Sequence, residues 1–165
     1  MNVVYVDKND NVIGAGSISE AIEGGIRVRI ARVFLTNNKG ELLIQKRSQT
    51  ISLPGKWDQT AAGHVDEGED YAEAATRELQ EEMGVRDVKL HEVAKYYAEE
   101  GDEIKTKKRF NKIFTGVYDG EVKIDNDEVS DYQWIDLATL EERMKNIPDD
   151  FTQGFIEAFE IYKKY

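Results

Sequence analysis

The segment from Gly63 to Val85 constrains the fold of this 165-residue chain most, because it predicts a loop that leads into a helix. Glycines punctuate its first part. Asp70, with Glu73 three residues later, is an Asp variant of the capping box that begins helices. Gly84 is placed to end the same helix. The segment therefore predicts a defined helix that must pack against another layer.

Three glutamates fall on one face of this predicted helix. Glu78, Glu81 and Glu82 are spaced i, i+3 and i+4, within an arc of about 100°. Crowded carboxylates repel one another, so such a face is either fully solvated or holds a cation, and oxygen ligands favour Mg²⁺, with Mn²⁺ next. Ala74 shares this sector, and Glu73 and Gln80 are predicted to face water. The opposite side is an apolar stripe suited to a sheet, made of Ala72, Ala75, Leu79 and Met83.

Apolar runs on both sides of the helix predict a sheet. Strands are expected at residues 3–6, 12–13, 26–36, 41–47, 88–98, 110–118 and 129–135. Residues 99–108 form a polar stretch between two of them, and helices are expected at 137–144 and 151–162. This order predicts an α/β or α+β sandwich with a mixed sheet, in one domain over 1–165 whose residues 1–25 are an N-terminal hairpin extension.

A net charge of −11 and the absence of cysteine narrow the function. The charge repels polyanions, so we expect no nucleic-acid polymer as a partner, and a phosphate substrate would need cations between it and the protein. Without cysteine, a thiolate zinc site and a cysteine nucleophile are impossible. No apolar run has the length of a membrane span and the start lacks a signal-peptide pattern, so a cytoplasmic location without membrane attachment is expected.

The full pattern over 63–85 is a glycine, five residues, Glu69, seven residues, then Arg-Glu-aliphatic-x-Glu-Glu-x-Gly-aliphatic. With every fixed position filled, the segment resembles the box of the Nudix superfamily, whose members mostly hydrolyse a diphosphate linked to another group. The resemblance extends over roughly residues 28 to 136. It implies a Nudix-type α/β/α sandwich with the box packed against the sheet.

The resemblance also implies roles for the residues of the box. Glu78, Glu81 and Glu82 would ligate the metal, with a backbone carbonyl near Ala62 or Gly63. Arg77 would pair with Glu69 and hold the loop against the helix. The general base would be Glu81 or Glu82, or an acid of a later loop: Glu99, Glu100, Asp102, Glu103 or Glu128.

Residues outside the box are similar to the Nudix branch that contains isopentenyl-diphosphate isomerase and also hydrolases. They are the stretches 41–48, 54–58 and 61–65. In the isomerase a catalytic cysteine precedes the Gly-His pair, whereas this chain has Ala62 there, which argues against isomerase activity. His64 matches a metal-binding histidine of the isomerase, and a structural, hydrogen-bonding role is the alternative.

Cationic side chains near the box are the candidates for binding substrate phosphates. They are Arg29, Arg32, Lys46 and Arg47, with surface ion pairs as the alternative. The basic cluster of Lys105, Lys107, Lys108 and Arg109 is interpreted as a solvated loop, and a role toward phosphate stays open. Trp57 and Trp134 are predicted to belong to the core, with stacking on a base as the alternative.

Together these patterns predict a Mg²⁺-dependent hydrolase that cleaves a phosphoanhydride bond, in a nucleoside diphosphate linked to another moiety or in a similar small diphosphate. Two alternatives are an isomerase, opposed by Ala62, and a non-catalytic nucleotide-binding module, opposed by the intact glutamates. The expected partner is the small diphosphate itself. A homodimer is a further expectation from the resemblance.

Overall fold

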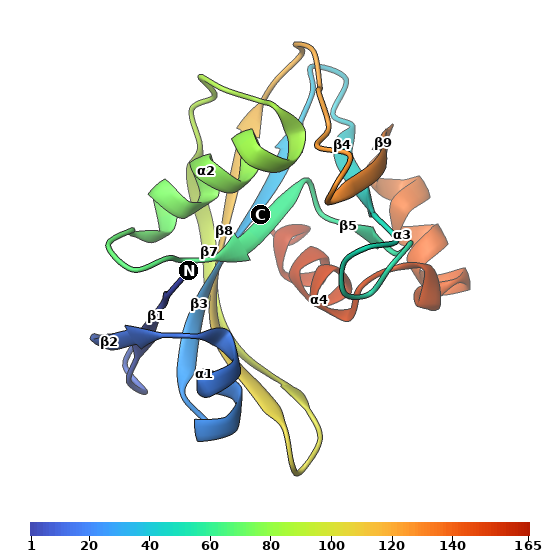
Figure 1. Cartoon of the computed structure of the whole chain (residues 1–165). Coiled ribbons are helices and arrows are strands. Elements are labelled where there is room, and N and C mark those ends of the chain that lie inside the picture. Colours follow the sequence, from blue (N-terminus) through green and yellow to red (C-terminus); the bar gives the residue numbers. More distant parts are fainter.

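The computed structural model describes residues 1–165 as one mixed sheet with helices on both faces (Figure 1). The strands are β1 (Val3–Val6), β2 (Val12–Gly16), β3 (Arg27–Thr36), β4 (Leu42–Arg47), β5 (Trp57–Asp58), β6 (Ala61–His64), β7 (His91–Gly101), β8 (Thr106–Val117) and β9 (Val129–Ile135). The helices are α1 (Ile18–Gly24), α2 (Tyr71–Met83), α3 (Leu137–Asn146), the 3-10 helix η1 (Pro148–Asp150) and α4 (Gln153–Tyr162). The predicted sandwich with a mixed sheet is confirmed.

Strand β3 organises the sheet. It runs parallel to β8 along its whole length and antiparallel to β1 and β6, while β7 completes a hairpin with β8. Because side chains alternate along a strand, Ala31, Val33 and Leu35 face α2, whereas Phe34 faces α4. Strand β4 touches β3 only at Thr36 and Leu42, and it carries β5 and β9. The two halves of the sheet therefore diverge from one end of β3.

Each face of the sheet has its own apolar core. The first core lies under α2 and includes Leu79 and Met83 of that helix. The second lies under α3 and α4, where Phe155 and Phe159 are buried against Phe34. Figure 1 shows α2 on one side of the sheet and the α3–α4 pair on the other. The site described below lies where β6 passes between these two layers.

The ends of α2 agree with the prediction, but the predicted assignment of residues to its faces was partly wrong. Asp70 and Glu73 form the capping box, and Gly84 ends the helix in the left-handed conformation. Ala72 is exposed, whereas Ala74 is fully buried in the first core. Glu82 is only 6% exposed, because the helix lies so close to β6 that the predicted metal face is partly covered by the sheet. The carboxylate face and the core face therefore overlap.

Two further segments differ from expectation. Most of residues 99–108 is not a loop: β7 extends to Gly101 and β8 begins at Thr106, with paired residues up to the turn. Strand β7 also begins three residues later than the predicted start at Val88. Cross-strand pairing overrides the polar composition here, because this hairpin needs only one face covered. No helix of the structure combines the length and hydropathy that a membrane crossing requires.

The N-terminal extension is more than the predicted hairpin, because it contains helix α1. A capping box of Ser17 and Glu20 begins this helix, and Gly25 ends it with a φ of 63°. Ala21 of α1 is buried with Val3 and Val28 in a small third cluster. The extension is thereby packed onto the start of β3 and lies beside the β7–β8 hairpin (Figure 1).

Candidate active site

Two carboxylates, the buried Glu82 and the partly buried Glu78, lie together beside β6. Glu82 accepts hydrogen bonds from Gln45 Nε2 at 2.8 Å and from the Ala62 backbone N–H at 3.2 Å. Burial, followed by the neighbouring charge of Glu78, raises the pKa of Glu82 well above its usual range. Burial also raises the pKa of Glu78 to about 7, although Arg77 opposes that shift. Glu78 is therefore harder to ionise chiefly because it is desolvated, and Glu82 because it is desolvated beside the charge of Glu78.

Arg77 ties the loop of the box to this helix. Its Nε lies 2.6 Å from Glu69 Oε1 and its NH2 lies 3.0 Å from Glu69 Oε2, so the pairing that the resemblance implies is present and is bidentate. The same guanidinium donates to Glu78 Oε1 at 2.7 Å and to the His64 carbonyl at 3.1 Å. Arg77 thus fixes the loop, the start of the box and the carboxylate of Glu78.

The third predicted ligand, Glu81, is arranged differently. Its side chain is 55% exposed, and its Oε2 lies 3.3 Å from Arg77 NH1. The structure gathers no group of three His, Asp or Glu side chains in the arrangement of a finished metal cage. The helix therefore presents the buried Glu82 and the partly buried Glu78, with the exposed Glu81 next to Glu82 in the sequence.

The surroundings of the two acids fit a hard dication. A Cβ on Gly63 would clash with the Glu78 carboxylate, so glycine lets the β6 backbone approach the acids closely. Gln45 Oε1 is buried without a hydrogen-bond partner, a further oxygen beside Glu82. Mutual repulsion of two desolvated carboxylates would be relieved by a cation bound between them. Oxygen donors of this kind suit Mg²⁺ or Mn²⁺.

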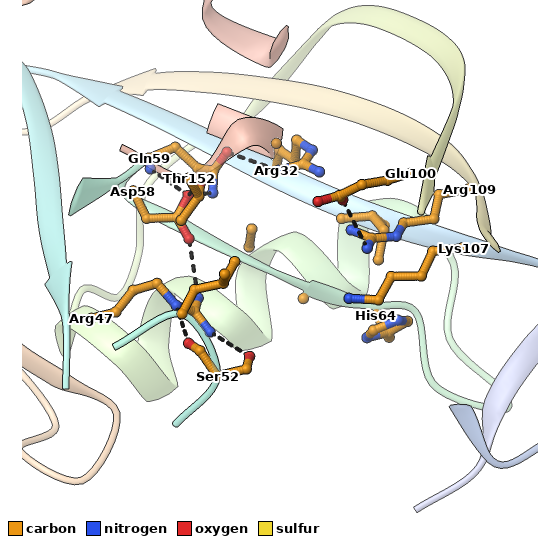
Figure 2. Close-up of a pocket in the computed structure, with 15 residues that line it drawn as sticks. Arg32, Arg47, Ser52, Asp58, Gln59, His64, Glu100, Lys107, Arg109 and Thr152 are labelled. Atoms are coloured by element: carbon orange, nitrogen blue, oxygen red, sulfur yellow. Dashed lines mark hydrogen bonds and ion pairs between the residues drawn. The ribbon is translucent and has the colours of Figure 1, made fainter. Parts of the chain in front are cut away.

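A cationic pocket of about 310 Å³ adjoins the backbone of Ala62 and Gly63. Figure 2 shows Arg47 on one side of this pocket and Lys107 and Arg109 on the other, with Arg32 between them near α4. Arg32 is only 6% exposed, and its two partners, Asn111 at 2.9 Å and Gln59 at 3.0 Å, are both uncharged. A buried guanidinium without a carboxylate partner is suited to an anionic ligand.

The four predicted phosphate-binding cations separate into two groups. Arg32 and Arg47 line the pocket, although Arg47 also binds Asp58 at 3.1 Å. Arg29 does not line it, because odd-numbered residues of β3 face α2, and its Nε donates to Asp10 at 2.7 Å. Lys46 also lies outside, 6.0 Å from the centre of the Trp57 ring. We therefore leave Arg29 and Lys46 out of the candidate site.

The β7–β8 hairpin supplies the cations that sequence reasoning undervalued. Lys107 and Arg109 lie on one side of β8 and line the pocket, so this basic cluster is not simply a solvated loop. Burial lowers the pKa of Arg109, and Glu100 pairs with it at 3.2 Å. Residues 107 and 109 are two positions apart, and residues so spaced share one side of a strand. The sequence could have indicated this only if the segment had been assigned as a strand.

The later acids considered as general bases also separate. Glu100 lines the cationic pocket, whereas Asp102 accepts backbone N–H groups at the hairpin turn. Glu128 lies near the box: burial, followed by the charges of Asp125 and Glu81, raises its pKa. Glu99 accepts a hydrogen bond from Tyr97, and Glu103 is exposed at the hairpin tip.

His64 points into the cationic pocket (Figure 2). Burial, and then the positive charges of Arg109, Lys107 and Arg32, lower the pKa of His64 to about 4. The imidazole is therefore neutral at pH 7, and the charges that shift its pKa are those of cations rather than carboxylates. This environment favours a hydrogen-bonding role over the metal-ligand role that the resemblance raised.

The comparisons with known proteins agree with this geometry. An isopentenyl-diphosphate Delta-isomerase 2 of Photorhabdus laumondii is 37% identical over 93% of this chain and 87% of its own. An uncharacterised Nudix hydrolase of Pseudomonas aeruginosa is 30% identical over 97% and 92% of the two chains. The crystal structure of DR0079 from Deinococcus radiodurans has the same fold, with a TM-score of 0.75, 24% identity and coverage of 89% and 90%.

A protein-family match covers most of this chain. The NUDIX domain family matches residues 26–155, most of the chain, and this stretch contains the box, both acids of the pair and the cationic pocket. The chain is therefore a member of the Nudix hydrolase family.

Proposed function

We propose that this protein is a metal-dependent pyrophosphohydrolase that cleaves the phosphoanhydride bond of a small diphosphate. The observation that carries the proposal is the acid pair of Glu78 and Glu82, which contacts the same backbone of Ala62 and Gly63 that lines a pocket with four cations: Arg32, Arg47, Lys107 and Arg109. The acid pair suits a dication, and the cations of the pocket suit a phosphate group. A metal-bound diphosphate is a ligand that would contact both at once.

Each group has a role in this proposal. Glu78 and Glu82, with a backbone carbonyl of Ala62 or Gly63, would hold Mg²⁺, or Mn²⁺ in its place. When bound, the ion supplies Lewis-acid polarisation of the phosphoryl oxygens and activation of water. The guanidinium of Arg32 binds the phosphate without first having to leave a carboxylate.

Proton transfer is assigned to the exposed acid of the box. Glu81 takes the proton of the attacking water, because its side chain is 55% exposed and has only one contact, with Arg77, whereas Glu82 is held by Gln45 and the Ala62 N–H. Glu128, which lies close enough to interact with Glu81, is the second candidate for the base. Arg77 and Glu69 position the loop and do not touch the substrate.

An isomerase of the kind named among the relatives is the second candidate, favoured by 37% identity. The resemblance to such isomerases includes a catalytic cysteine, and this chain has Ala62 at that position and no cysteine elsewhere. Isomerisation by that mechanism is therefore disfavoured. The homodimer stays a prediction of the sequence.

The test is a panel of diphosphates assayed with and without Mg²⁺. Nucleoside diphosphates, sugar nucleotides, dinucleotides and alkyl diphosphates would be incubated with the protein, and released phosphate would be measured. We expect Mg²⁺-dependent release from at least one class, reduced at least a hundredfold by Glu78→Gln and by Glu81→Gln. Glu67→Gln, an exposed acid of the same box, is the matched control. Equal rates in all three variants would refute the assignment.

A further inference from the structure

Arg32 is a buried cation whose hydrogen-bond partners are both neutral. Its Nε donates to Asn111 Oδ1 at 2.9 Å, and its NH1 donates to Gln59 Oε1 at 3.0 Å. Asn111 and Gln59 are each 1% exposed, so two buried amides hold the guanidinium in place without cancelling its charge. A buried charge without an opposite charge is costly, and a ligand that brings the opposite charge removes that cost.

The two acids that line the same pocket are paired with other cations. Asp58 Oδ2 accepts a hydrogen bond from Arg47 NH1 at 3.1 Å, and Glu100 Oε2 accepts one from Arg109 NH2 at 3.2 Å. Arg47 and Arg109 are therefore partly neutralised by carboxylates of the pocket, whereas Arg32 is not.

The two amides are turned so that each presents its oxygen to Arg32. Gln59 Nε2 donates to Asp58 Oδ1, which leaves Gln59 Oε1 to accept from the guanidinium. Asn111 Nδ2 donates to the backbone carbonyl of Arg109 at 3.1 Å, which leaves Asn111 Oδ1 for the same purpose. The orientation of both amides is thus fixed from behind, and their NH2 groups point away from the cation.

One side of the guanidinium stays open. Arg32 NH2 makes no hydrogen bond within the protein, and a Cβ on Gly154 of α4 would lie 3.0 Å from it. Glycine therefore keeps this side clear of a side chain. Arg32 and Gly154 line both the cationic pocket and a smaller cavity, which Glu157 also lines without pairing with Arg32. The NH2 group is thus available to an anion that enters the pocket.

We propose that Gln59 and Asn111 are specificity-determining positioning residues, whose neutral amides fix Arg32 and leave its charge to the anionic end of the ligand. This inference rests on the proposed function for the role of the pocket, and it names the residues that set the pocket's charge. A carboxylate at either position would hold the guanidinium equally well but would neutralise it. The fold would then persist, while affinity for a polyanion would fall.

Asn111→Asp and Asn111→Leu separate the charge from the contact. Both side chains are close to asparagine in size and both lose the hydrogen bond to the Arg109 carbonyl, but only aspartate places a negative charge against Arg32. Calorimetry in Mg²⁺ would measure binding of methylenediphosphonate, whose P–C–P bridge water does not cleave. We expect Asn111→Asp to weaken binding at least about tenfold and Asn111→Leu about threefold or less. Gln59→Glu repeats the test on the other side of the guanidinium, with the same expected loss as Asn111→Asp.

Gln133→Glu is the matched control and should bind like the wild type. Gln133 accepts a hydrogen bond from Arg143 NH1 at 3.2 Å, and it lies exposed on β9, outside the pocket. Urea unfolding should give Asn111→Asp a midpoint no lower than that of Asn111→Leu, because aspartate pairs with Arg32. For any diphosphate that is turned over, the loss should appear in KM and not in kcat.

Equal weakening by aspartate and leucine would mean that contact, not charge, matters, and it would overturn the inference. Wild-type affinity in Asn111→Asp, or no binding by the wild type, would do the same. Released phosphate separates the two proposals. Binding that falls only with the acidic variants, without turnover of any diphosphate, would remove the proposed function and leave the role of the amides.

Discussion

Asp10 joins the N-terminal extension to the Nudix domain, and its replacement by asparagine should destabilise the protein measurably. Arg29 Nε donates to Asp10 Oδ1 at 2.7 Å, Tyr71 Oη donates to Oδ2 at 2.9 Å, and Lys95 Nζ also contacts Oδ2. The Asp10 side chain is 4% exposed. One carboxylate thus holds groups from β3, α2 and β7.

The magnitude follows from these contacts. Removing one partner of a buried ion pair costs about 3–5 kcal/mol, but Arg29 and Lys95 are 15% and 39% exposed and can be rehydrated. Asparagine keeps the shape and tolerates the φ of 63° at this position. We therefore expect Asp10→Asn to lower the free energy of unfolding by about 2 kcal/mol, a fall in Tm of about 4–8 °C.

The pH dependence has a definite sign. Burial opposes ionisation of Asp10, but hydrogen bonds from Lys95, Arg29 and Tyr71 outweigh it and lower its pKa below the ordinary value of 3.8. The stabilisation is therefore complete above the unfolded-state pKa and is lost as pH falls through the lower folded-state pKa. The difference between wild type and Asp10→Asn should be constant from pH 7 to 5 and shrink below pH 4.

Urea unfolding at pH 7, 5, 4 and 3 measures this difference directly. Glu23→Gln is the control, an exposed acid of the same extension. A wild-type advantage that persists undiminished at pH 3 would mean that packing, not charge, is the cause. No advantage at pH 7 would refute the reasoning entirely.

Three other changes test separate contacts. Gly63→Ala should lower metal-dependent turnover and cost about 1–3 kcal/mol in a denaturation assay, because the new methyl group clashes with Glu78. Arg77→Lys should increase hydrogen exchange in the box loop and slow turnover, because lysine cannot replace the two-pronged contact with Glu69; unchanged exchange would contradict this. Thr152→Val should lower the urea midpoint by the equivalent of about 1–2 kcal/mol, because it removes the N-cap of α4, and an unchanged midpoint would exclude that role.

Local signals made much of α2 and the sheet predictable. The capping box of α2 joins residues three positions apart and its terminal glycine contacts a residue four positions back, and both formed as expected. The burial of Glu82 was not predictable, because it depends on Gln45 and Ala62 from strands far away in the sequence. The face of Arg29 was missed for a related reason: only the pairing of β3 decides which side of the sheet its side chains occupy. The pairing of strands that are far apart in the sequence thus decided which side chains are buried and which face the site, and the periodicity of the sequence alone does not decide this.

The parity of β8 has a consequence for how this protein tolerates changes in chain length. Lys107, Arg109 and Asn111 share one side of the strand, while Phe110 packs toward the core beneath α2. Extra residues at the hairpin tip, between Gly101 and Thr106, would leave this order intact. A single insertion within the strand would instead exchange its two sides. The basic side chains would then face the apolar core, and the ring of Phe110 would face the cationic pocket. Natural variation in this hairpin should therefore gather at its tip.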